Sequence, residues 1–357
     1  VDDLWTYYQR WGMVVAPWTV EVSAPDVVGP GQVLQVQARV TYPCPAPFDQ
    51  VEKVYTWPQD PVAVITVPPP FALAPGEGSR RTLNITRGGD ADTVNWSVVS
   101  PVERGYWTAD IGVMAEANVT DYAISYGWYS DRAGGEGTAR VGCDGMPPVI
   151  ESFSVAGGEK VLGDRDVTVA FVTGDAHTRV SSVALSIDDG LTWRALEGTS
   201  GGTDVRLDLG DGGYFVHLSV EDAVGNSASE VRTLVLDTSP PVISEFQLAD
   251  GAEILSSSSV HVTLHAEDVT TGLDLMALRV GDGQWGPWEP YREDLGLELP
   301  TDGDYRVEVR VRDQVGNTAT AQDSVRLDMT APFITRFELA QGLAYSKTSE
   351  VEVVLSA

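Results

Sequence analysis

The sequence predicts an all-β protein built of tandem β-sandwich domains in an extended array. The first reason is an internal repeat, because Asp222–Asn226 (DAVGN) returns as Asp313–Asn317 (DQVGN), 313 − 222 = 91 residues later. Asp237–Pro241 (DTSPP) returns as Asp328–Pro332 (DMTAP) after the same interval. The second reason is the strict alternation of apolar and charged residues in segments such as Tyr305–Asp313 (YRVEVRVRD). A fixed repeat of this length indicates tandem domains, and alternation with period two indicates half-buried strands.

The repeat places domain boundaries near residues 145, 239 and 330. A Pro-Pro or Ala-Pro pair lies at each boundary, and because proline cannot extend a central strand, it marks the crossing to the next domain. No segment shows a helical period with caps, so we expect very little helix. The predicted parts are a diverged domain with an aromatic N-terminal arm (1–145), two full repeats (146–239 and 240–330) and the first two strands of an incomplete repeat (331–357).

The Asp-x-x-Gly-Asn element lies between two alternating segments, which predicts a hairpin turn. Gly225 and Gly316 would supply the positive φ of the turn, while Asp222 and Asp313 would accept hydrogen bonds from its amides. In the first domain, Asp131–Gly135 (DRAGG) has a similar place in the sequence. We expect the same turn there.

The composition is strongly acidic. The 357 residues include 52 acidic and 23 basic side chains, giving a formal net charge of −29 that is distributed over all parts of the chain. Such a surface repels nucleic acid and anionic membranes and attracts cations, which excludes a nucleic-acid partner. No apolar run reaches about eighteen residues, so we expect no direct membrane insertion of this segment.

Cysteine and asparagine usage points to the outside of the cell. Cys44 and Cys143 both lie in the predicted first domain without the spacing of a zinc or redox motif. We expect one disulfide between them, stabilising the domain by roughly 4 kcal/mol in the chain-entropy model. Three of the five asparagines begin glycosylation sequons: Asn84, Asn95 and Asn118. A disulfide and N-glycans predict an extracellular or cell-surface glycoprotein.

The alternating strand, the Asp-x-x-Gly-Asn turn and the Asp-Thr-x-Pro-Pro linker together resemble the bacterial and archaeal Ig-like repeats of cell-surface adhesins and S-layer-type proteins. The resemblance is close over residues 146–357 and weak over 1–145. It implies immunoglobulin-like sandwiches with a structural, adhesive or spacing role. Fold alone does not decide the activity of a protein.

In some of those adhesins calcium ions bind between consecutive domains, so the resemblance implies a set of possible ligands. Calcium needs six to eight oxygens, which one hairpin cannot supply alone. The alternative is that the turn aspartates only bond turn amides while the linker aspartates are solvated. The matching positions are Asp222, Asn226, Asp237, Asp313, Asn317 and Asp328.

The sequence lacks the parts of an enzyme. Ser186–Trp193 (SIDDGLTW) matches the Asp-box hairpin of sialidases, but a sialidase propeller needs several such boxes. We therefore interpret it as a stapled turn with Trp193 in the core. His261 and His265 are four residues apart on a predicted strand, about 13 Å, which is too far for one metal ion. No Ser-His-Asp arrangement or phosphate loop is present.

Trp285 and Trp288 have two interpretations. One of them is expected to be the core tryptophan of its sandwich, because large rings dominate such cores. The alternative is an exposed platform on which sugars stack.

The function predicted from these observations is a non-enzymatic, secreted or cell-surface rod that serves as a stalk, surface-layer or adhesin component. Its partners would be other copies of itself, surface proteins or glycans, and calcium is its one possible cofactor. One alternative is an extracellular filament subunit, in which the aromatic arm of residues 1–18 completes segment 333–357 of the next molecule by strand addition. Another is an accessory carbohydrate-binding region of a larger enzyme. The proposed contact residues of the arm are Trp5, Tyr7, Tyr8 and Trp11.

Overall fold

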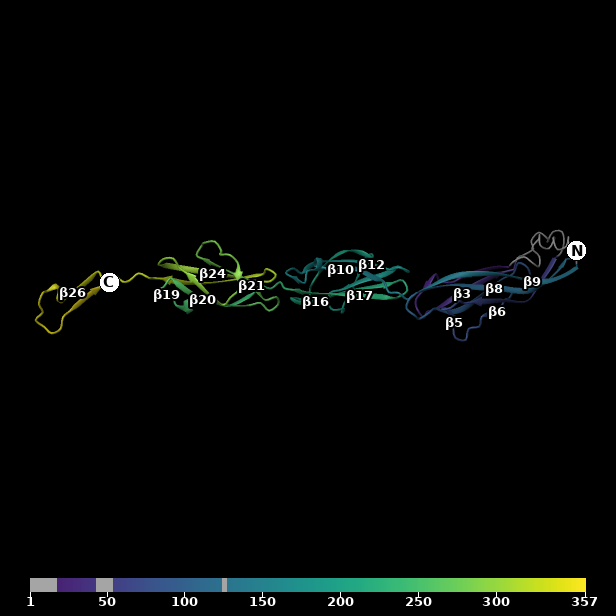
Figure 1. Ribbon diagram of the computed structural model, residues 1–357, viewed down its shortest axis with the longest axis horizontal. Coiled ribbons are helices and arrows are strands. Elements are labelled where there is room, and N and C mark those ends of the chain that lie inside the picture. The colour runs from purple at the N-terminus through teal and green to yellow at the C-terminus, as the bar shows by residue number, and fades with distance from the viewer. Residues whose placement is uncertain (1–17, 43–53, 124–126) are drawn as a thin grey trace.

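The computed structural model describes residues 18–42, 54–123 and 127–357, where the regular elements are β-strands and short 3-10 turns. The sheets follow one another along one long axis, with the sheets of β1 to β9 at one end and the C-terminal hairpin at the other (Figure 1). The fold is all-β, with immunoglobulin-like β-sandwiches in an extended tandem array, as predicted. The predicted contact arm, Trp5, Tyr7, Tyr8 and Trp11, lies outside the described residues.

The first sandwich packs the sheet β1-β3-β7-β5 against the sheet β2-β9-β8-β4-β6. Residues alternate between exposed and buried along β3, and its buried face joins Trp96 of β7 and Ile111 of β8 in one core. Alternation thus creates the core, because successive side chains of a strand point to opposite faces. The strands are β1 Thr19–Ser23, β2 Val27–Val28, β3 Val33–Thr41, β4 Val54–Thr66, β5 Ala72–Leu73, β6 Arg80–Thr82, β7 Ala91–Val99, β8 Tyr106–Ala123 and β9 Gly127–Asp144.

The second and third sandwiches share one topology. Sheets β10-β12-β15 and β11-β17-β16-β13-β14 enclose one core, and β18-β20-β23 and β19-β25-β24-β21-β22 enclose the next. The second has β10 Val149–Val155, β11 Val161–Leu162, β12 Asp166–Gly174, β13 Val180–Ser186, β14 Arg194–Leu196, β15 Ser200–Arg206, β16 Gly212–Asp222 and β17 Ser227–Leu236. The third has β18 Val242–Leu248, β19 Ile254–Leu255, β20 Ser259–Glu267, β21 Leu273–Val280, β22 Glu289–Pro290, β23 Asp294–Glu298, β24 Gly303–Asp313 and β25 Thr318–Leu327.

The two predicted hairpin turns are confirmed. Strand β16 pairs with β17, and β24 pairs with β25, on either side of the Asp-x-x-Gly-Asn elements. Gly225 and Gly316 have φ angles of 94° and 103°, which favour glycine. Asp222 and Asp313 accept hydrogen bonds from the turn amides.

The prediction of a hairpin turn at Asp131–Gly135 is wrong. Strand β9 runs without a break through this segment, and Gly135 pairs with Ala115 of β8. Instead, Gly134 and Gly135 allow neighbouring backbone segments to approach closely. A β-carbon on Gly135 would lie 1.9 Å from the backbone oxygen of Trp18, which precedes β1.

The expected disulfide between Cys44 and Cys143 is not formed in the structure. Cys143 is a free, fully buried thiol whose Sγ lies 3.6 Å from the backbone oxygen of Pro101, beside the start of β3. Cys44 itself lies outside the described residues.

The chain ends in a two-stranded antiparallel sheet of β26 Arg336–Leu339 and β27 Val353–Ser356. Apolar side chains of this sheet are exposed, with exposed fractions of 62% for Phe337 and 59% for Leu355. Its strands correspond to the predicted first two strands of a further repeat.

We predict that Gly135→Ala destabilises the first sandwich, because the added methyl group must displace the backbone of Trp18. The expected loss in the free energy of unfolding is about 2 kcal/mol or more, the usual cost of overpacking. Chemical denaturation measures it. The matched control is Gly112→Ala in the neighbouring strand, where a β-carbon meets nothing within 4 Å. Equal stability of the two variants would contradict this account.

Candidate functional site

A cluster of three carboxylates lies where the first sandwich meets the second. Asp144 ends β9 of the first sandwich, Asp175 follows β12 of the second, and Asp222 ends β16. One oxygen of each lies within 4.8 Å of the other two. Asp144 and Asp222 have exposed fractions of 0% and 1%, and Asp175 is half-buried. Both sandwiches therefore direct negative charge at one point.

Turn chemistry holds two of these carboxylates in place. Oδ1 of Asp222 accepts the backbone N–H groups of Val224 and Asn226, both at 2.9 Å. Oδ1 of Asp175 accepts those of His177 and Thr178 at 2.9 and 2.6 Å. Burial raises the pKa of Asp175, but its hydrogen bonds with Thr178 and His177 hold that pKa below the usual value. Asp175 is therefore ionised at neutral pH.

Two further contacts join the sandwiches at this first junction. The side-chain amide of Asn226 donates to the backbone oxygen of Asp144 at 2.9 Å. The rings of Tyr106, from the first sandwich, and His177, from the second, stack with centroids 4.1 Å apart and an interplanar angle of 6°. The hairpin after Asp222 thus belongs to one sandwich and binds the other.

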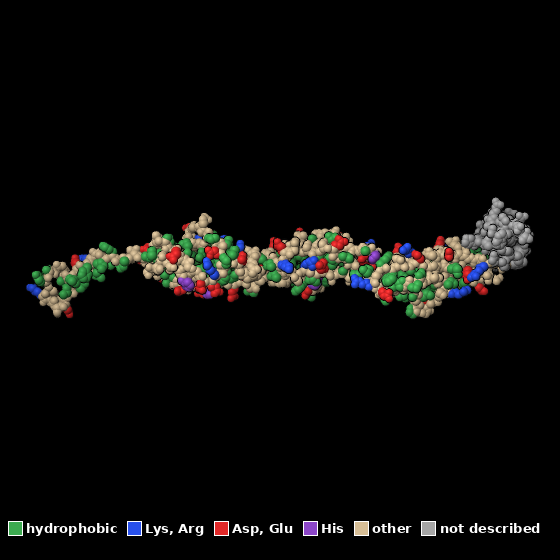
Figure 2. Space-filling view, viewed as in Figure 1, with side chains coloured by type: hydrophobic (Ala, Val, Ile, Leu, Met, Phe, Trp, Pro, Cys, Tyr) green, Lys and Arg blue, Asp and Glu red, His purple; other side chains and the backbone are tan. Residues whose placement is uncertain are grey.

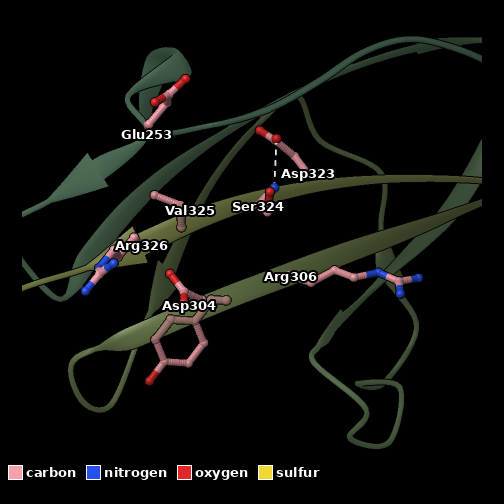
Figure 3. A pocket seen from close by; sticks show the side chains of 8 residues that line it. Glu253, Asp304, Arg306, Asp323, Ser324, Val325 and Arg326 are labelled. Carbon is pink, nitrogen blue, oxygen red and sulfur yellow. Dashed lines mark hydrogen bonds between the residues drawn. The ribbon is translucent and has the colours of Figure 1, made fainter.

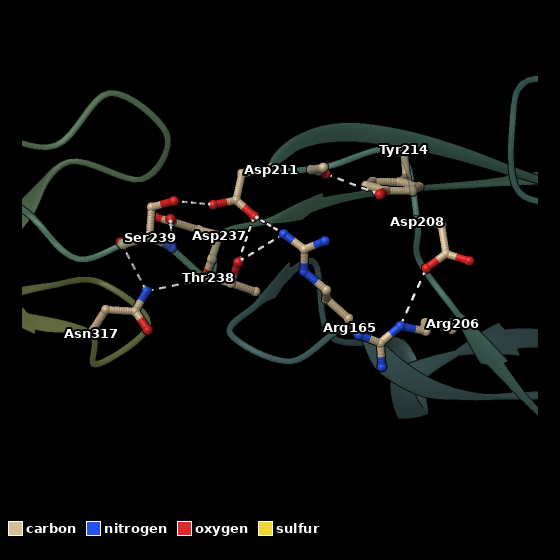
Figure 4. A network of polar contacts seen from close by, with 10 residues as sticks. Arg165, Arg206, Asp208, Asp211, Tyr214, Asp237, Thr238, Ser239 and Asn317 are labelled. Atoms are coloured by element: carbon tan, nitrogen blue, oxygen red, sulfur yellow. Dashed lines mark hydrogen bonds and ion pairs between the residues drawn. The ribbon is translucent and has the colours of Figure 1, made fainter.

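The same arrangement recurs between the second and third sandwiches. Asp237 follows β17, Asp268 follows β20 and Asp313 ends β24, and their oxygens again lie within 4.8 Å of one another. Asp237 and Asp313 are fully buried. The side-chain amide of Asn317 donates to the backbone oxygens of Asp237 and Ser239 at 3.1 and 3.2 Å (Figure 4).

The linker at this second junction is held by the preceding sandwich. Asp211 accepts the hydroxyl groups of Thr238 and Ser239 at 2.8 and 2.6 Å, and Arg165 lies 3.5 Å from the same carboxylate (Figure 4). The hydrogen bond from Ser239, followed by those from Thr238, lowers the pKa of Asp211. Asp302 holds the linker after the third sandwich in the same way. These hydrogen bonds restrict the conformation of the linker and therefore the orientation of the segment that follows it.

The buried junction carboxylates have no basic partner. Among the described residues their hydrogen bonds come from neutral amide and hydroxyl groups. Oδ2 of Asp144 is buried and has no hydrogen-bond partner within the described ranges. Burying a charge without pairing it costs several kcal/mol, so a cation at this point would offset a large penalty.

The geometry fits a hard divalent cation. Calcium binds oxygens at about 2.3–2.6 Å, so two oxygens that share one ion lie at most about 5 Å apart. The 4.8 Å span of each carboxylate cluster satisfies this condition. The clusters contain carboxylates without histidine or cysteine, a donor set that favours calcium or magnesium over zinc.

The structure divides the predicted ligand set between the junctions. Asp222 and Asn226 lie at the first junction, and Asp237, Asp313 and Asn317 lie at the second. Asp328 is exposed and joins neither cluster; its Oδ1 accepts the N–H of Thr330 at 3.3 Å.

Three cluster members were missing from the predicted set: Asp144, Asp175 and Asp268. Asp144 holds the position that Asp237 has in the next sandwich, at the end of the last strand. Asp175 and Asp268 both follow a strand and begin an Asp-x-x-Thr segment. That shared segment is the signal that could have identified them.

The Asp-box match is a stapled turn, as predicted. Asp188 accepts the hydroxyl and the backbone N–H of Thr192, and the hydroxyl of Ser186 at 2.7 Å. These bonds, the one from the Thr192 hydroxyl first, lower the pKa of Asp188 to about 2. The expectation that Trp193 lies in the core is wrong, because the residue is 48% exposed and its indole N–H donates to the Gly190 backbone oxygen.

The expectation of a core tryptophan at position 285 or 288 is also wrong. Both residues are only half-buried, and both stack on arginines of the outer sheet face. The core of the third sandwich is aliphatic instead, with Leu264, Val309 and Leu327 among its buried members.

The other polar clusters that the structure describes do not form a further metal-binding or catalytic group of residues. His261 and His265 face different carboxylates, Asp250 at 3.0 Å and Glu245 at 3.6 Å, on the acidic surface of the third sandwich (Figure 2). The hydrogen bond to Asp250 raises the pKa of His261.

An open hollow of about 610 Å³ lies beside Arg306 and Arg326 at the end of the same sandwich (Figure 3). Its polar side chains lie at the surface and show no nucleophile with an adjacent base.

Comparisons with known proteins give similarity at the level of fold. No family model and no curated protein matches the chain. Solved structures that resemble it include a bacterial ice-binding adhesin involved in host cell surface retention, with 15% identity, a TM-score of 0.38, and coverage of 88% of this chain and 100% of that one. A tetra-tandem repeat from the extending region of a large adhesion protein has 16% identity, a TM-score of 0.27, and coverage of 88% and 75%.

The EC1-4 segment of Drosophila N-cadherin is a third such structure, with 13% identity, a TM-score of 0.31, and coverage of 88% and 76%. At these identities and TM-scores the likenesses carry no argument about function. The fold class rests on the strands and cores described above. No helix among the described residues is long and apolar enough to cross a membrane.

We predict that Thr192→Val raises the pKa of Asp188 by about one unit, because it removes a hydrogen bond to the charged form. Because the pKa of Asp188 is lower in the folded state than in the unfolded state, where it is near 4, the ionised carboxylate stabilises the folded turn at pH values above about 4. This stabilisation is lost as the pH falls through about 2. Carboxyl NMR titration of the whole chain measures the shift. Thr233→Val on β17 is the control, and a pKa unchanged in Thr192→Val would contradict the assignment.

Proposed function

We propose that this chain is a non-enzymatic, extracellular rod that acts as a stalk or adhesin component of a cell surface, with a divalent cation, calcium in the first place, bound at each junction. The observation that carries the proposal is that, at both junctions, buried carboxylates from consecutive sandwiches meet without a basic partner among the residues that the structure describes. A stalk must resist bending at its joints. A cation shared by two sandwiches would supply that resistance.

The cation would be held at the first junction by Asp144, Asp175 and Asp222, and at the second by Asp237, Asp268 and Asp313. Further oxygens would come from backbone carbonyl groups and water, since calcium takes six to eight. The ion would neutralise the charge that otherwise pushes the sandwiches apart. The prolyl linkers and the clamp at Asp211 would limit the remaining motion.

Other features support an extracellular location. The three sequons, Asn84, Asn95 and Asn118, all have exposed side chains, as glycan attachment requires. The acidic surface would keep such rods soluble and apart. The partners would be other copies of the chain, surface proteins or glycans, and a surface layer is one assembly in which such a rod could serve.

We predict that calcium raises the unfolding temperature of the intact chain by on the order of 10 °C. An ion at 100 times its dissociation constant stabilises by about 2.7 kcal/mol, and one kcal/mol shifts a domain of this size by about 4–8 °C. Chelator should reverse the effect. Asp144→Asn should reduce the response to calcium while leaving the stability in chelator unchanged or higher, because it removes one repelling charge.

The matched control is Asp110→Asn, an exposed aspartate of β8 away from the junction, which should respond like the natural chain. Calorimetry in calcium and in chelator measures all three proteins. An unfolding temperature of the natural chain that does not change with calcium or magnesium would contradict cation binding.

Strand addition remains a second proposal, favoured by the exposed apolar side chains of the β26–β27 sheet. A strand from another copy would cover them and yield a filament. Deleting residues 1–17, which keeps the buried Trp18 of the first sandwich, separates the two proposals. A filament should fall to monomers in size-exclusion chromatography with light scattering, whereas a rod should keep its oligomeric state.

A further inference from the structure

A ladder of alternating arginine and tryptophan side chains covers the outer face of the third sandwich. Trp285 lies between Arg279 and Arg310, with guanidinium carbons 4.8 and 4.7 Å from the ring centroid. Trp288 lies between Arg310 and Arg312, at 4.3 and 4.9 Å. These five residues are called the Arg–Trp ladder below. It is an array of cation–π contacts with Arg310 at its centre.

Strand register explains why the ladder forms. Arg310 and Arg312 are outward residues of β24, where inward Val309 and Val311 are fully buried. The partner of Arg310 across the strand pair is Ala277 of β21, whose small side chain leaves room above the sheet. The segment after β21 folds back over that space, and the N–H of Gly286 donates to the Leu278 backbone oxygen. Both indoles are thereby brought over the sheet.

Arg310 differs from its neighbours in charge pairing. Arg279 pairs with Glu308, and Arg312 lies 3.3 Å from Asp274. Arg310 has neither a carboxylate partner nor a hydrogen bond within the described part of the chain, and its Nε is buried without a partner. A half-buried cation is thus left without an anion in a chain of net charge −29.

The ladder offers donors and no acceptors. Guanidinium groups cover the faces of both indoles, so the sugar-stacking platform considered from the sequence is not available there. The edges remain, and among the described residues neither indole N–H has an acceptor. Guanidinium N–H groups bind a planar carboxylate with two parallel hydrogen bonds. Indole N–H groups only donate, so they bind an acceptor such as the oxygen of a sugar hydroxyl group.

We propose that the Arg–Trp ladder binds a glycan terminus that carries a single carboxylate on an otherwise neutral sugar chain. The carboxylate pairs with Arg310, while the sugar hydroxyls meet the indole edges and the hydroxyl of Thr320, which is opposite Arg310 on β25. The acidic surface around the ladder selects against polyanions, because each further charge is repelled within a Debye length of about 8 Å. The site uses none of the junction carboxylates and goes beyond a purely mechanical role.

The test is isothermal titration of the intact chain in calcium with a neutral oligosaccharide that ends in one carboxylated sugar. The control ligand is the same compound with its carboxyl group reduced to an alcohol. We expect the carboxylate form to bind at least about tenfold more tightly, the effect of one charge-assisted pair. Arg310→Gln should lose the same factor, and Arg310→Lys should bind weakly because it lacks the planar fork. Arg326→Gln, an exposed arginine of β25, should bind like the natural chain.

The unfolding temperature of each variant separates a binding defect from a folding defect, and the reduced ligand tests the natural chain without any substitution. Equal binding of the two ligands, or no binding of either, would overturn the proposal and leave the ladder as a staple for the segment 281–288. Preferential binding of an acidic peptide or of a polyuronate would overturn the ligand assignment. The calcium response of the junctions is measured independently, so either proposal can fail alone.

Discussion

The structure depends on how buried negative charge is balanced between consecutive sandwiches. At each of two junctions, an aspartate at the end of one sandwich meets two from the next, with oxygens within 4.8 Å. Hydrogen bonds from turn amides orient these carboxylates but do not neutralise them. Without a cation, the junction is the place where repulsion opposes the end-to-end arrangement. If a cation is bound there, the same carboxylates would hold the two sandwiches together.

One local element serves both the fold and the junction. The Asp-x-x-Gly-Asn turn closes the β16–β17 and β24–β25 hairpins, and its asparagine donates to the backbone of the preceding sandwich. The aspartate that stabilises the turn is also one of the two buried members of the carboxylate cluster. A substitution in this turn would therefore affect a sandwich and its attachment together. This coupling gives a physical reason for the turn to recur at a fixed interval.

Much of the fold could be predicted from the sequence, because it follows from local rules. Alternation identified the strand ending at Asp313, and turn chemistry identified the bonds that Asp222 and Asp313 make. The close packing of Gly135 against the backbone of Trp18 could not be predicted from the sequence, because the two residues are far apart along the chain. Nor did it place Trp193 and Trp285, because either ring could cover a core or an outer face.

The candidate site was predictable only in part. The turn and linker residues could be found from the repeat, but Asp175 and Asp268 lie in loops that reach the junction only when the sandwiches stack end to end. Their association with Asp144 and Asp237 is a property of the assembled rod. The Arg–Trp ladder is likewise a product of strand register, since Arg310 and Ala277 become neighbours only across the β21–β24 pair.

The most direct test of the central claim is a distance measurement across the first junction by pulsed electron resonance. Spin labels at the exposed positions Val33 and Leu209 would report the first and second sandwiches, with Cys44 replaced by serine and the buried Cys143 left in place. The account predicts one narrow distance distribution in calcium and a markedly broader one in chelator. Identical distributions in the two conditions would contradict it.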